Sequence, residues 1–469
     1  MHVIPQSWSH LHILVSVFPP FGLLFSLGFY VAGQRAKNEG IKRTCLVLIG
    51  LIALLSIPIY LSGDGAMAQL SGNARYAKNA MATHYGWGII GLLVLAITGL
   101  SAFFDLWRTR GVGRAFSKKG YLTLGLAALA LGLTAAAGGL GFAINHRELE
   151  STVVIPDVST SPLWPHVHII LNHLPTAGFV FALFFFVVAL VTNNNLMKQG
   201  SLILFVICAI AGIPTYVTGT ASMWALTQPP LPDISKAAIN AHRDMALWTL
   251  VGLAFTATAS WIELWRYRAC GRFSMLPLTL VLLFALATLA IMTETGHRGG
   301  LINHPEIRTA GDVLPSDPNA GISMGIEAGM KNLGWFMFWQ IVHFFGYCVI
   351  FGTLAAVMLR VLGFWKSVPY AAVHRLLPLA FIGVLMNVVS GMLMMLADSY
   401  RYVVSDVMFA PKIAFIFIAA AAVLYFSVSD RLWSVKAGED APKGAKWIAV
   451  MTLLGWAGVI ACGRLLPYV

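Results

Sequence analysis

The sequence predicts an all-α membrane protein with about twelve transmembrane helices. Of its 469 residues, 58% are hydrophobic and only 11% are charged, which is about half of the charged fraction usual in soluble domains. The apolar residues also gather in runs of about 18 or more, the length that crosses the ~30 Å hydrocarbon core of a bilayer. A water-soluble core does not require so many long apolar runs, so we expect the chain to cross a membrane repeatedly.

Twelve apolar segments carry this prediction, and the loops between them differ in charge. The segments are expected at residues 11–33, 43–63, 80–106, 118–142, 163–192, 199–224, 238–265, 274–297, 333–361, 372–397, 408–429 and 446–466. Loops on one face hold 20 of the 31 Lys and Arg residues, and the positive-inside rule places that face in the cytoplasm. Both termini are therefore expected on the periplasmic side of a bacterial inner membrane. This loop asymmetry explains the net charge of +12, so we expect membrane lipid and no nucleic acid as a partner.

The first eight predicted helices form two copies of one four-helix unit. Five blocks recur in the same order at offsets of 156–158 residues: WSHLHI and WPHVHI, IPIYLSGDGAM and IPTYVTGTASM, His84 and His242, DLWRTRGVGR and ELWRYRACGR, INHRE and INHPE. A fixed offset is the signature of an internal repeat. Each copy has an even number of helices, so the copies are parallel, whereas many transporters have inverted repeats. We expect three four-helix bundles, at 1–158, 159–325 and 326–469, the last of which does not share the blocks.

Histidine is the residue type with the most uneven distribution. Twelve of the 13 histidines fall in the predicted outer loops or the outer halves of helices. Ionisable groups in membrane segments are costly and are often functional, and imidazoles at one depth in a helix bundle are suited to bind haem iron. Helix-end histidines can also be interfacial or capping residues, and the sequence leaves that alternative open. The candidate cofactor ligands are His12, His84, His146, His168, His173, His242, His297, His304 and His343.

Helix geometry restricts how these ligands can pair. His168 and His173 are five residues apart, about 140° around a helix, so they cannot serve the same iron. Ligands must come from different helices, and we expect His173 to share the haem iron with His242 or with His297. His173 and His297 have no counterpart in the first copy, which favours a haem site in the second copy alone. The histidines common to both copies are interpreted as a second site or as structural residues.

Other chemistry has weaker support in the sequence. Imidazole also suits copper, and the MLMML run at 392–396 offers thioether ligands, although such a run is more typical of a helix core. Glu294 and His297 share one helix face and could take protons from a quinol. The five cysteines form no CxxC or CxxCH pair, which excludes a covalently attached c-type haem.

Short motifs resemble two membrane families. At NHLP (172–175), AHRDMA (241–246) and GGLINHPEIR (299–308), the second copy resembles a bacterial family numbered 2231 among domains of unknown function. The resemblance covers residues 160–310 well and 1–158 less well, and it implies haem b and periplasmic c-type cytochromes as partners. Residues 333–469 are similar to copper-resistance D-type membrane domains, which implies His343 and His374 as ligand candidates. The matching positions there are His343, Gly363, Pro378, Gly383, Gly391, Lys412, Trp456, Gly463 and Arg464.

These patterns together predict an electron-transfer function. We expect a haem-b subunit of a membrane oxidoreductase that exchanges electrons between the quinone pool and a periplasmic cytochrome or dehydrogenase. Because the inner half of the membrane offers only His374, we expect no complete transfer across the bilayer. Two other functions stay open: a transporter of copper, another metal or a small solute, and a membrane anchor for a periplasmic enzyme.

Overall fold

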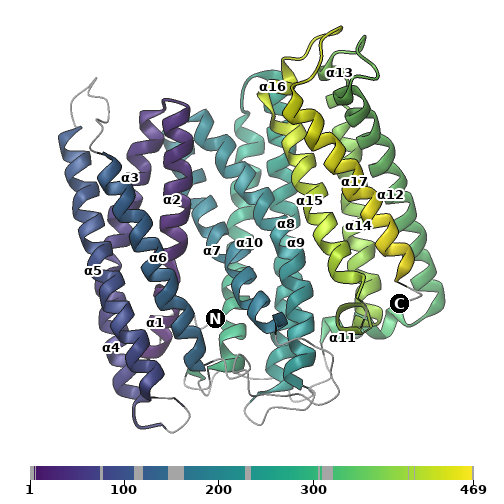
Figure 1. Ribbon diagram of the computed structural model, residues 1–469. Helices are drawn as coiled ribbons and strands as arrows, with labels where there is room; N and C mark the ends of the chain where they lie inside the picture. The colour runs from purple at the N-terminus through teal and green to yellow at the C-terminus, as the bar shows by residue number, and fades with distance from the viewer. Residues whose placement is uncertain are drawn as a thin grey trace. The chain divides into compact units, whose positions relative to one another are not determined.

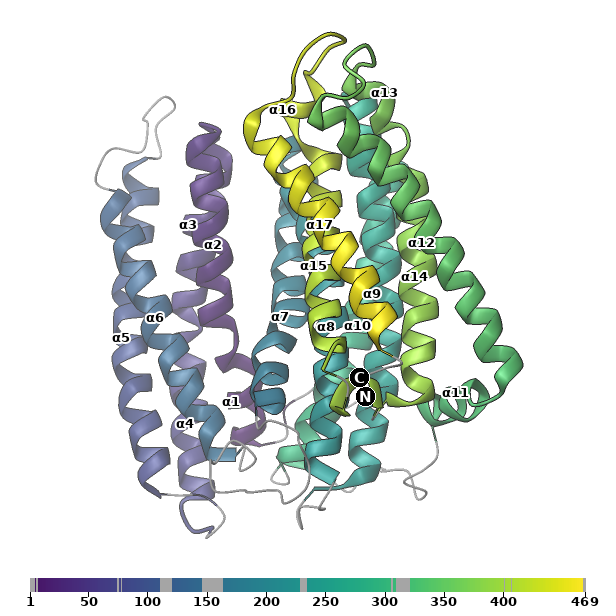
Figure 2. The same ribbon diagram turned by 45° about the vertical axis from the view of Figure 1, so that its right-hand side comes forward.

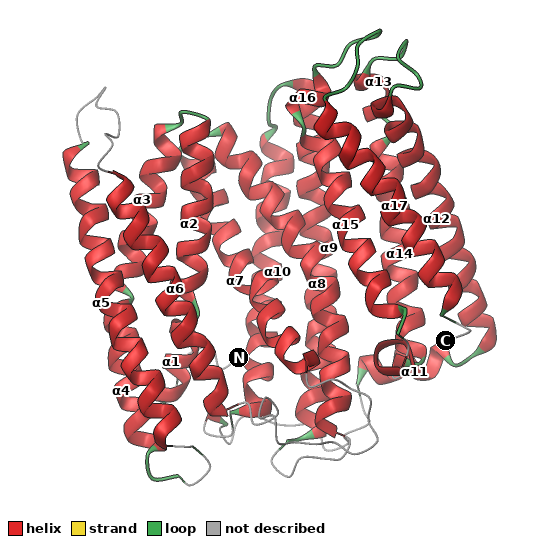
Figure 3. Ribbon diagram, viewed as in Figure 1, coloured by secondary structure: helices red, strands yellow, loops and turns green. Residues whose placement is uncertain are grey.

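The protein is built from long α-helices. The computed structural model describes residues 5, 7–73, 76, 78–109, 120–145, 163–227, 234–304, 307–308, 321–399, 401–405 and 407–466. In this part of the chain Figure 3 shows helices and loops and no strand. Twelve helical spans within it are long and apolar enough to cross a membrane. The predicted all-α membrane architecture is therefore confirmed.

One compact unit comprises Met1–Val154, Thr176–Ser201 and Gly296–Val313. Within it α1 packs on α4, α2 on α3 and α6, and α5 on both α3 and α6 (Figure 1). These helices are α1 (Trp8–Ser16), α2 (Phe18–Arg35), α3 (Glu39–Leu54), α4 (Ser56–Leu70), α5 (Lys78–Arg108) and α6 (Gly120–Asn145). The unit also includes parts of α7 (Leu163–Val191), α8 (Asn195–Thr227) and α10 (Met275–Asn303).

The other compact unit comprises Ile155–Pro175, Leu202–Thr295 and Leu314–Val469. Figure 2 shows its C-terminal helices, in which α12 packs on α14 and α17, and α15 packs on α17. Its remaining elements are α9 (Lys236–Cys270), α11 (Ile322–Met330), α12 (Leu333–Leu362), α13 (Tyr370–His374), α14 (Leu377–Ala397), a π-helix (Arg401–Ser405), α15 (Phe409–Val428), α16 (Asp430–Trp433) and α17 (Lys443–Leu465). The unit boundaries predicted at 158 and 325 describe sequence similarity, and they stay a prediction.

Each of the twelve predicted segments overlaps one observed span, but several helices are longer than their apolar stretch. The segment predicted at 238–265, for example, lies within α9, which runs from Lys236 to Cys270. Hydropathy detects only the part of a helix that lies in hydrocarbon, whereas backbone hydrogen bonds continue into the headgroup region.

The sequence also did not predict the break at Val17 between α1 and α2. Pro19 and Pro20 lie in the first turn of α2, and each lacks the N–H that a continuous helix requires.

Loops at one end of the C-terminal helices are held together by charge. The fully buried guanidinium of Arg360 donates to the carbonyls of Val368, Lys436 and Glu439. Asp440 accepts hydrogen bonds from Lys366 at 2.8 Å and Lys446 at 2.9 Å, which lower the pKa of its carboxyl group to about 2. Because this pKa is depressed, the contribution of these bonds to stability is complete above the ordinary Asp pKa and is lost as the pH falls towards 2.

Residues that lie 156 positions apart in the sequence, at equivalent places in the two repeats, contact each other inside the first compact unit. The rings of Phe29 and Phe185 stack with centroids 4.1 Å apart. Asn38 and Asn194 bond to each other through both amides, at 3.1 and 3.4 Å, and each also caps a helix by accepting a backbone N–H. The same positions of two similar segments therefore contact each other. Contacts at a two-fold axis between identical subunits have this property. The offset is 156 residues in both pairs.

We expect the double substitution N38D/N194D to lower the melting temperature more than the two single substitutions together. Aspartate still caps a helix, but two facing carboxylates repel one another and lose the amide donors. A coupling energy of about 1 kcal/mol or more is expected from a double-mutant cycle at pH 7. N38S/N194S is the control, because serine caps without charge. Additive effects of the two aspartates would contradict the contact.

Small residues let α12 and α14 touch along their backbones. A Cβ atom added at Gly383 would lie 2.7 Å from the carbonyl oxygen of Gly346 and 3.0 Å from the backbone nitrogen of Ile350. Neither backbone atom can rotate away as a side chain could. Glycine therefore sets the distance between these helices, as in other membrane helix pairs.

We expect Gly383→Ala to destabilise the C-terminal helices by about 1–3 kcal/mol, the usual cost of overpacking. Gly352→Ala on α12 is the matched control, because a Cβ there would meet nothing within 4 Å. Alanine has a higher helix propensity than glycine, so the melting temperature of this control in detergent should equal that of the wild type or be slightly higher. Equal melting temperatures for the two variants would contradict the close packing.

Candidate histidine ligand sites

His12 is held by the neighbouring helix through one ring nitrogen. Its Nδ1 lies 3.2 Å from the carbonyl oxygen of Ile59 and 3.3 Å from the Ser62 hydroxyl on α4. A carbonyl oxygen only accepts, so Nδ1 carries the proton and Nε2 keeps the lone pair that a metal needs. The ring lies against Gly63, where an added Cβ would be 2.9 Å from Cε1. Histidines that bind metals are commonly oriented by such a hydrogen bond.

His84 on α5 is held in the same way and lies close to His12. Its Nδ1 is 2.8 Å from the carbonyl oxygen of Ala137 on α6, and a Cβ at Gly141 would lie 2.9 Å from its Cε1. The two imidazole centroids are 6.0 Å apart, with an interplanar angle of 80°. Two imidazoles that bind one metal ion from opposite sides at about 2 Å each have centroids roughly 6 Å apart. The structure thus brings two histidines of the first copy to the separation of a ligand pair.

The second copy repeats both anchors. His168 Nδ1 lies 3.0 Å from the carbonyl oxygen of Thr215 on α8, and an added Cβ at Gly219 would be 2.7 Å from its Cε1. His242 Nδ1 lies 3.0 Å from the carbonyl oxygen of Thr295 on α10. Both histidines therefore carry the proton on Nδ1, as their equivalents in the first copy do. The sequence predicted these residues as ligands but did not predict which nitrogen is anchored.

The other predicted ligands of the second copy have different surroundings. His173 Nδ1 lies 2.6 Å from the carbonyl oxygen of Ile169 in its own helix. The His297 ring stacks on His10 with centroids 5.8 Å apart. The backbone N–H of His304, just after the end of α10, donates to the carbonyl oxygen of Gly300. The pairing of His173 with His242 or His297 stays a prediction. His146 lies outside the described residues.

The two histidines of the C-terminal helices differ in which nitrogen is engaged. His343 Nδ1 on α12 lies 2.9 Å from the Ser390 hydroxyl on α14. That hydroxyl donates to the Met386 carbonyl, so it accepts from Nδ1–H and Nε2 keeps its lone pair. His374, by contrast, donates from Nε2 to the Ser427 carbonyl at 3.1 Å and is buried against Trp265. This bond engages Nε2, which stays unprotonated in the other anchored histidines, and the ring is buried, so His374 has the surroundings of a structural residue.

Arg243 and Asp244 have a role that sequence reasoning missed, although both belong to the AHRDMA motif. The Asp244 carboxylate accepts the backbone N–H groups of Ile322 at 2.9 Å and Ser323 at 2.8 Å, which caps α11. The buried Arg243 guanidinium lies 4.0 Å from Glu327 on the same short helix. These charges therefore dock α11 on α9. Their position beside His242 in an apolar helix was the only signal available in the sequence.

We expect Asp244→Ala to release the first turn of α11, because loss of a capping carboxylate costs about 0.5–2 kcal/mol. Amide hydrogen exchange at Ile322 and Ser323 should become faster, while exchange within α14 stays the same. Asp244→Asn, which retains an acceptor oxygen, should give an intermediate rate. Unchanged exchange at the two capped amides would show that another group holds the helix.

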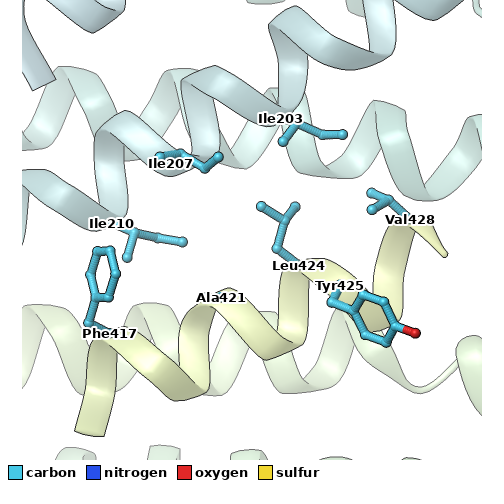
Figure 4. A pocket seen from close by; sticks show the side chains of 8 residues that line it. All are labelled: Ile203, Ile207, Ile210, Phe417, Ala421, Leu424, Tyr425 and Val428. Carbon is cyan, nitrogen blue, oxygen red and sulfur yellow. The ribbon is translucent and has the colours of Figure 1, made fainter. Parts of the chain in front are cut away.

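Other apolar features of the second compact unit offer little ligand chemistry. Met395 is 2% exposed and belongs to a buried cluster with Leu396 and Tyr216, against which Met392 packs, so these thioethers serve as core. The pocket between α8 and α15 is lined by aliphatic and aromatic side chains (Figure 4): Ile203, Ile207, Ile210, Phe417, Ala421, Leu424, Tyr425 and Val428. Among the described residues, no group of three or more His, Cys, Asp or Glu side chains could hold a metal ion.

Comparison with known proteins concerns the second four-helix unit. Residues 165–304 match the model of a family described as predicted membrane protein (DUF2231). The matched range includes His168, His173, His242 and His297, and the resemblance expected from the motifs is confirmed for this segment. No curated protein and no solved structure matches the chain. The chain is accordingly an integral membrane protein whose central segment is similar to this family.

Proposed function

We propose that the protein is a haem-b electron-transfer subunit of a bacterial inner-membrane oxidoreductase. It would exchange electrons between the quinone pool and a periplasmic cytochrome or dehydrogenase subunit. The observation that carries this proposal is the pair His12 and His84, whose imidazoles come from neighbouring helices with centroids 6.0 Å apart and Nδ1 anchored. The loop charges support a periplasmic position for these helix ends.

The donor set fits a haem iron. Haem b is held by one or two protein ligands, and the imidazoles of His12 and His84 would supply two nitrogen donors to it. The hydrogen bonds from Nδ1 to the carbonyls of Ile59 and Ala137 fix the tautomer and raise the basicity of Nε2. Gly63 and Gly141 leave room for the rings where any side chain would collide with them. Bound haem would supply one-electron redox chemistry, while the chain orients the ligands and keeps the site within the helices.

The second copy supports a second haem of the same kind. His168 and His242 have the anchors of His12 and His84, so we assign them as its ligands by equivalence. This assignment differs from the sequence-based pairing of His173 with His242, and it leaves His173, His297 and His304 as alternatives. Because His374 is engaged through Nε2, the proposal includes no haem at the cytoplasmic face.

We expect the purified protein to give a b-type α-band in a reduced-minus-oxidised spectrum, with haem b identified by its pyridine haemochrome. His84→Ala should remove the share of the spectrum that belongs to the first site. Gly141→Ala should push the His84 ring and lower haem affinity by about 10–100-fold, the usual effect of disturbing a ligand's support. Gly139→Ala on the same helix is the matched control, because a Cβ there meets nothing within 4 Å.

A flat spectrum from a host with ample haem would rule out this function. Metal analysis of the same sample would then separate a copper or other metal transporter from a membrane anchor without a cofactor. A haem spectrum of undiminished intensity in both His12→Ala and His84→Ala would retain the function and exclude this pair as ligands.

A further inference from the structure

One arrangement of the histidine sites recurs in the C-terminal helices. In all three four-helix units a histidine on the first helix turns Nδ1 towards a hydroxyl on the second helix, at 3.3, 3.4 and 2.9 Å. The hydroxyl residue is followed each time by the glycine on which the ring lies. The three sets are His12 with Ser62-Gly63, His168 with Thr218-Gly219, and His343 with Ser390-Gly391. The C-terminal unit, which shares none of the sequence blocks, therefore shares this contact.

The third helix of the C-terminal unit differs from that of the first copy. In the first copy His84 lies against Gly141 of the fourth helix. In the C-terminal unit Lys412 of α15 takes this place, and a Cβ at Gly463 of α17 would lie 3.6 Å from its Cε and Nζ. The charge of Lys412 interacts with His343. An ammonium group on the third helix thus lies against a glycine of the fourth, as the second imidazole does in the first copy.

The difference between a histidine and a lysine on the third helix changes what the site can bind. A lysine ammonium has three donors and no acceptor, so it is not a metal ligand while it is charged. His343 Nε2 is an acceptor, since Nδ1 donates to Ser390. The pair therefore suits a ligand that has an oxygen acceptor for Lys412 and a hydroxyl donor for His343. A quinol meets both requirements, because each of its hydroxyl groups can donate and accept a hydrogen bond. The oxidised quinone has carbonyl oxygens only, so it can accept from Lys412 but cannot donate to His343.

The surroundings favour a ligand that arrives from the lipid. Phe344 and Phe345, next to His343 in the chain, are 61% and 64% exposed, as expected for side chains that face hydrocarbon. One turn further along α12, Tyr347 lies with its ring centroid 6.3 Å from that of Trp456 on α17. Aromatic rings of this kind can pack against a planar quinone ring.

We propose that His343 and Lys412 bind the head group of a quinone or quinol in the C-terminal four-helix unit. This inference rests on the proposed function, which requires a quinone partner but does not say where it binds. Lys412 donates a hydrogen bond to a quinone oxygen, and His343 Nε2 accepts one from a quinol hydroxyl. The histidines of the first two copies would bind the haem irons, and in the C-terminal helices His343 would bind the head group together with Lys412.

The test is the binding of decylubiquinone and of its reduced form, decylubiquinol, to the full-length protein in nanodiscs, followed by quenching of tryptophan fluorescence. Lys412→Ala should weaken the saturable binding of both forms by about tenfold, the effect of losing one charged hydrogen bond. His343→Ala should weaken the binding of decylubiquinol, which alone can donate to Nε2. Lys412→Arg keeps the positive charge and should retain binding within a few-fold, which separates loss of the ligand contact from misfolding. Lys443→Ala, at an exposed lysine on α17, is the control and should bind as the wild type does. The haem spectrum of every variant is recorded on the same sample.

The outcomes separate this site from the proposed function. Weakened binding in Lys412→Ala and His343→Ala with unchanged haem content supports the site. Wild-type binding in both variants overturns it, even if the protein contains haem. Loss of haem absorbance in His343→Ala also overturns it, because His343 would then be an iron ligand. If the wild type contains no haem but binds decylubiquinone through Lys412, the proposed function fails and the quinone site stands.

Discussion

A backbone in hydrocarbon has no water with which to bond, and the whole structure depends on this constraint. Each span satisfies its backbone by forming a helix, because an unsatisfied N–H or C=O costs several kcal/mol there. Polar side chains within the spans obey the same constraint. The anchored nitrogens of His12, His84, His168 and His242 each bond to a carbonyl oxygen of a neighbouring helix. One hydrogen bond therefore links helix packing to the tautomer of each ring.

Small residues make those hydrogen bonds possible. An imidazole can reach the backbone of the next helix only where no side chain intervenes, and Gly63, Gly141 and Gly219 provide the space. The same principle sets the contact between α12 and α14 at Gly346 and Gly383. Without a hydrophobic force between helices in lipid, close packing and interhelical hydrogen bonds supply the association energy. The glycines thus contribute both to stability and to the geometry of the candidate ligands.

One contact recurs in each of the three predicted four-helix units. The first helix always contributes a histidine held beside a hydroxyl residue and a glycine. The third helix contributes His84 at Gly141 in the first copy and Lys412 at Gly463 in the C-terminal helices. These residues differ in chemistry, because a neutral imidazole can bind a metal ion whereas an ammonium group can only donate hydrogen bonds. The contacts between residues 156 positions apart, such as Asn38 with Asn194, show that similar segments also pack on one another. A duplicated bundle can in this way keep its scaffold while its binding sites change.

The sequence by itself determined the membrane class, the twelve spans and the nine candidate histidines, because hydropathy, loop charge and the spacing of repeated blocks are properties of the chain alone. It could not determine which ring nitrogen is anchored, since that depends on which carbonyl of another helix lies opposite. Spacing along α7 excluded a shared iron for His168 and His173, yet only packing brought His12 and His84 to 6.0 Å. Packing also determined that His343 is anchored through Nδ1 and His374 through Nε2. It placed the Asp244 carboxylate at the first turn of α11, which it caps. These features belong to the tertiary structure because each is a contact between segments far apart in the sequence.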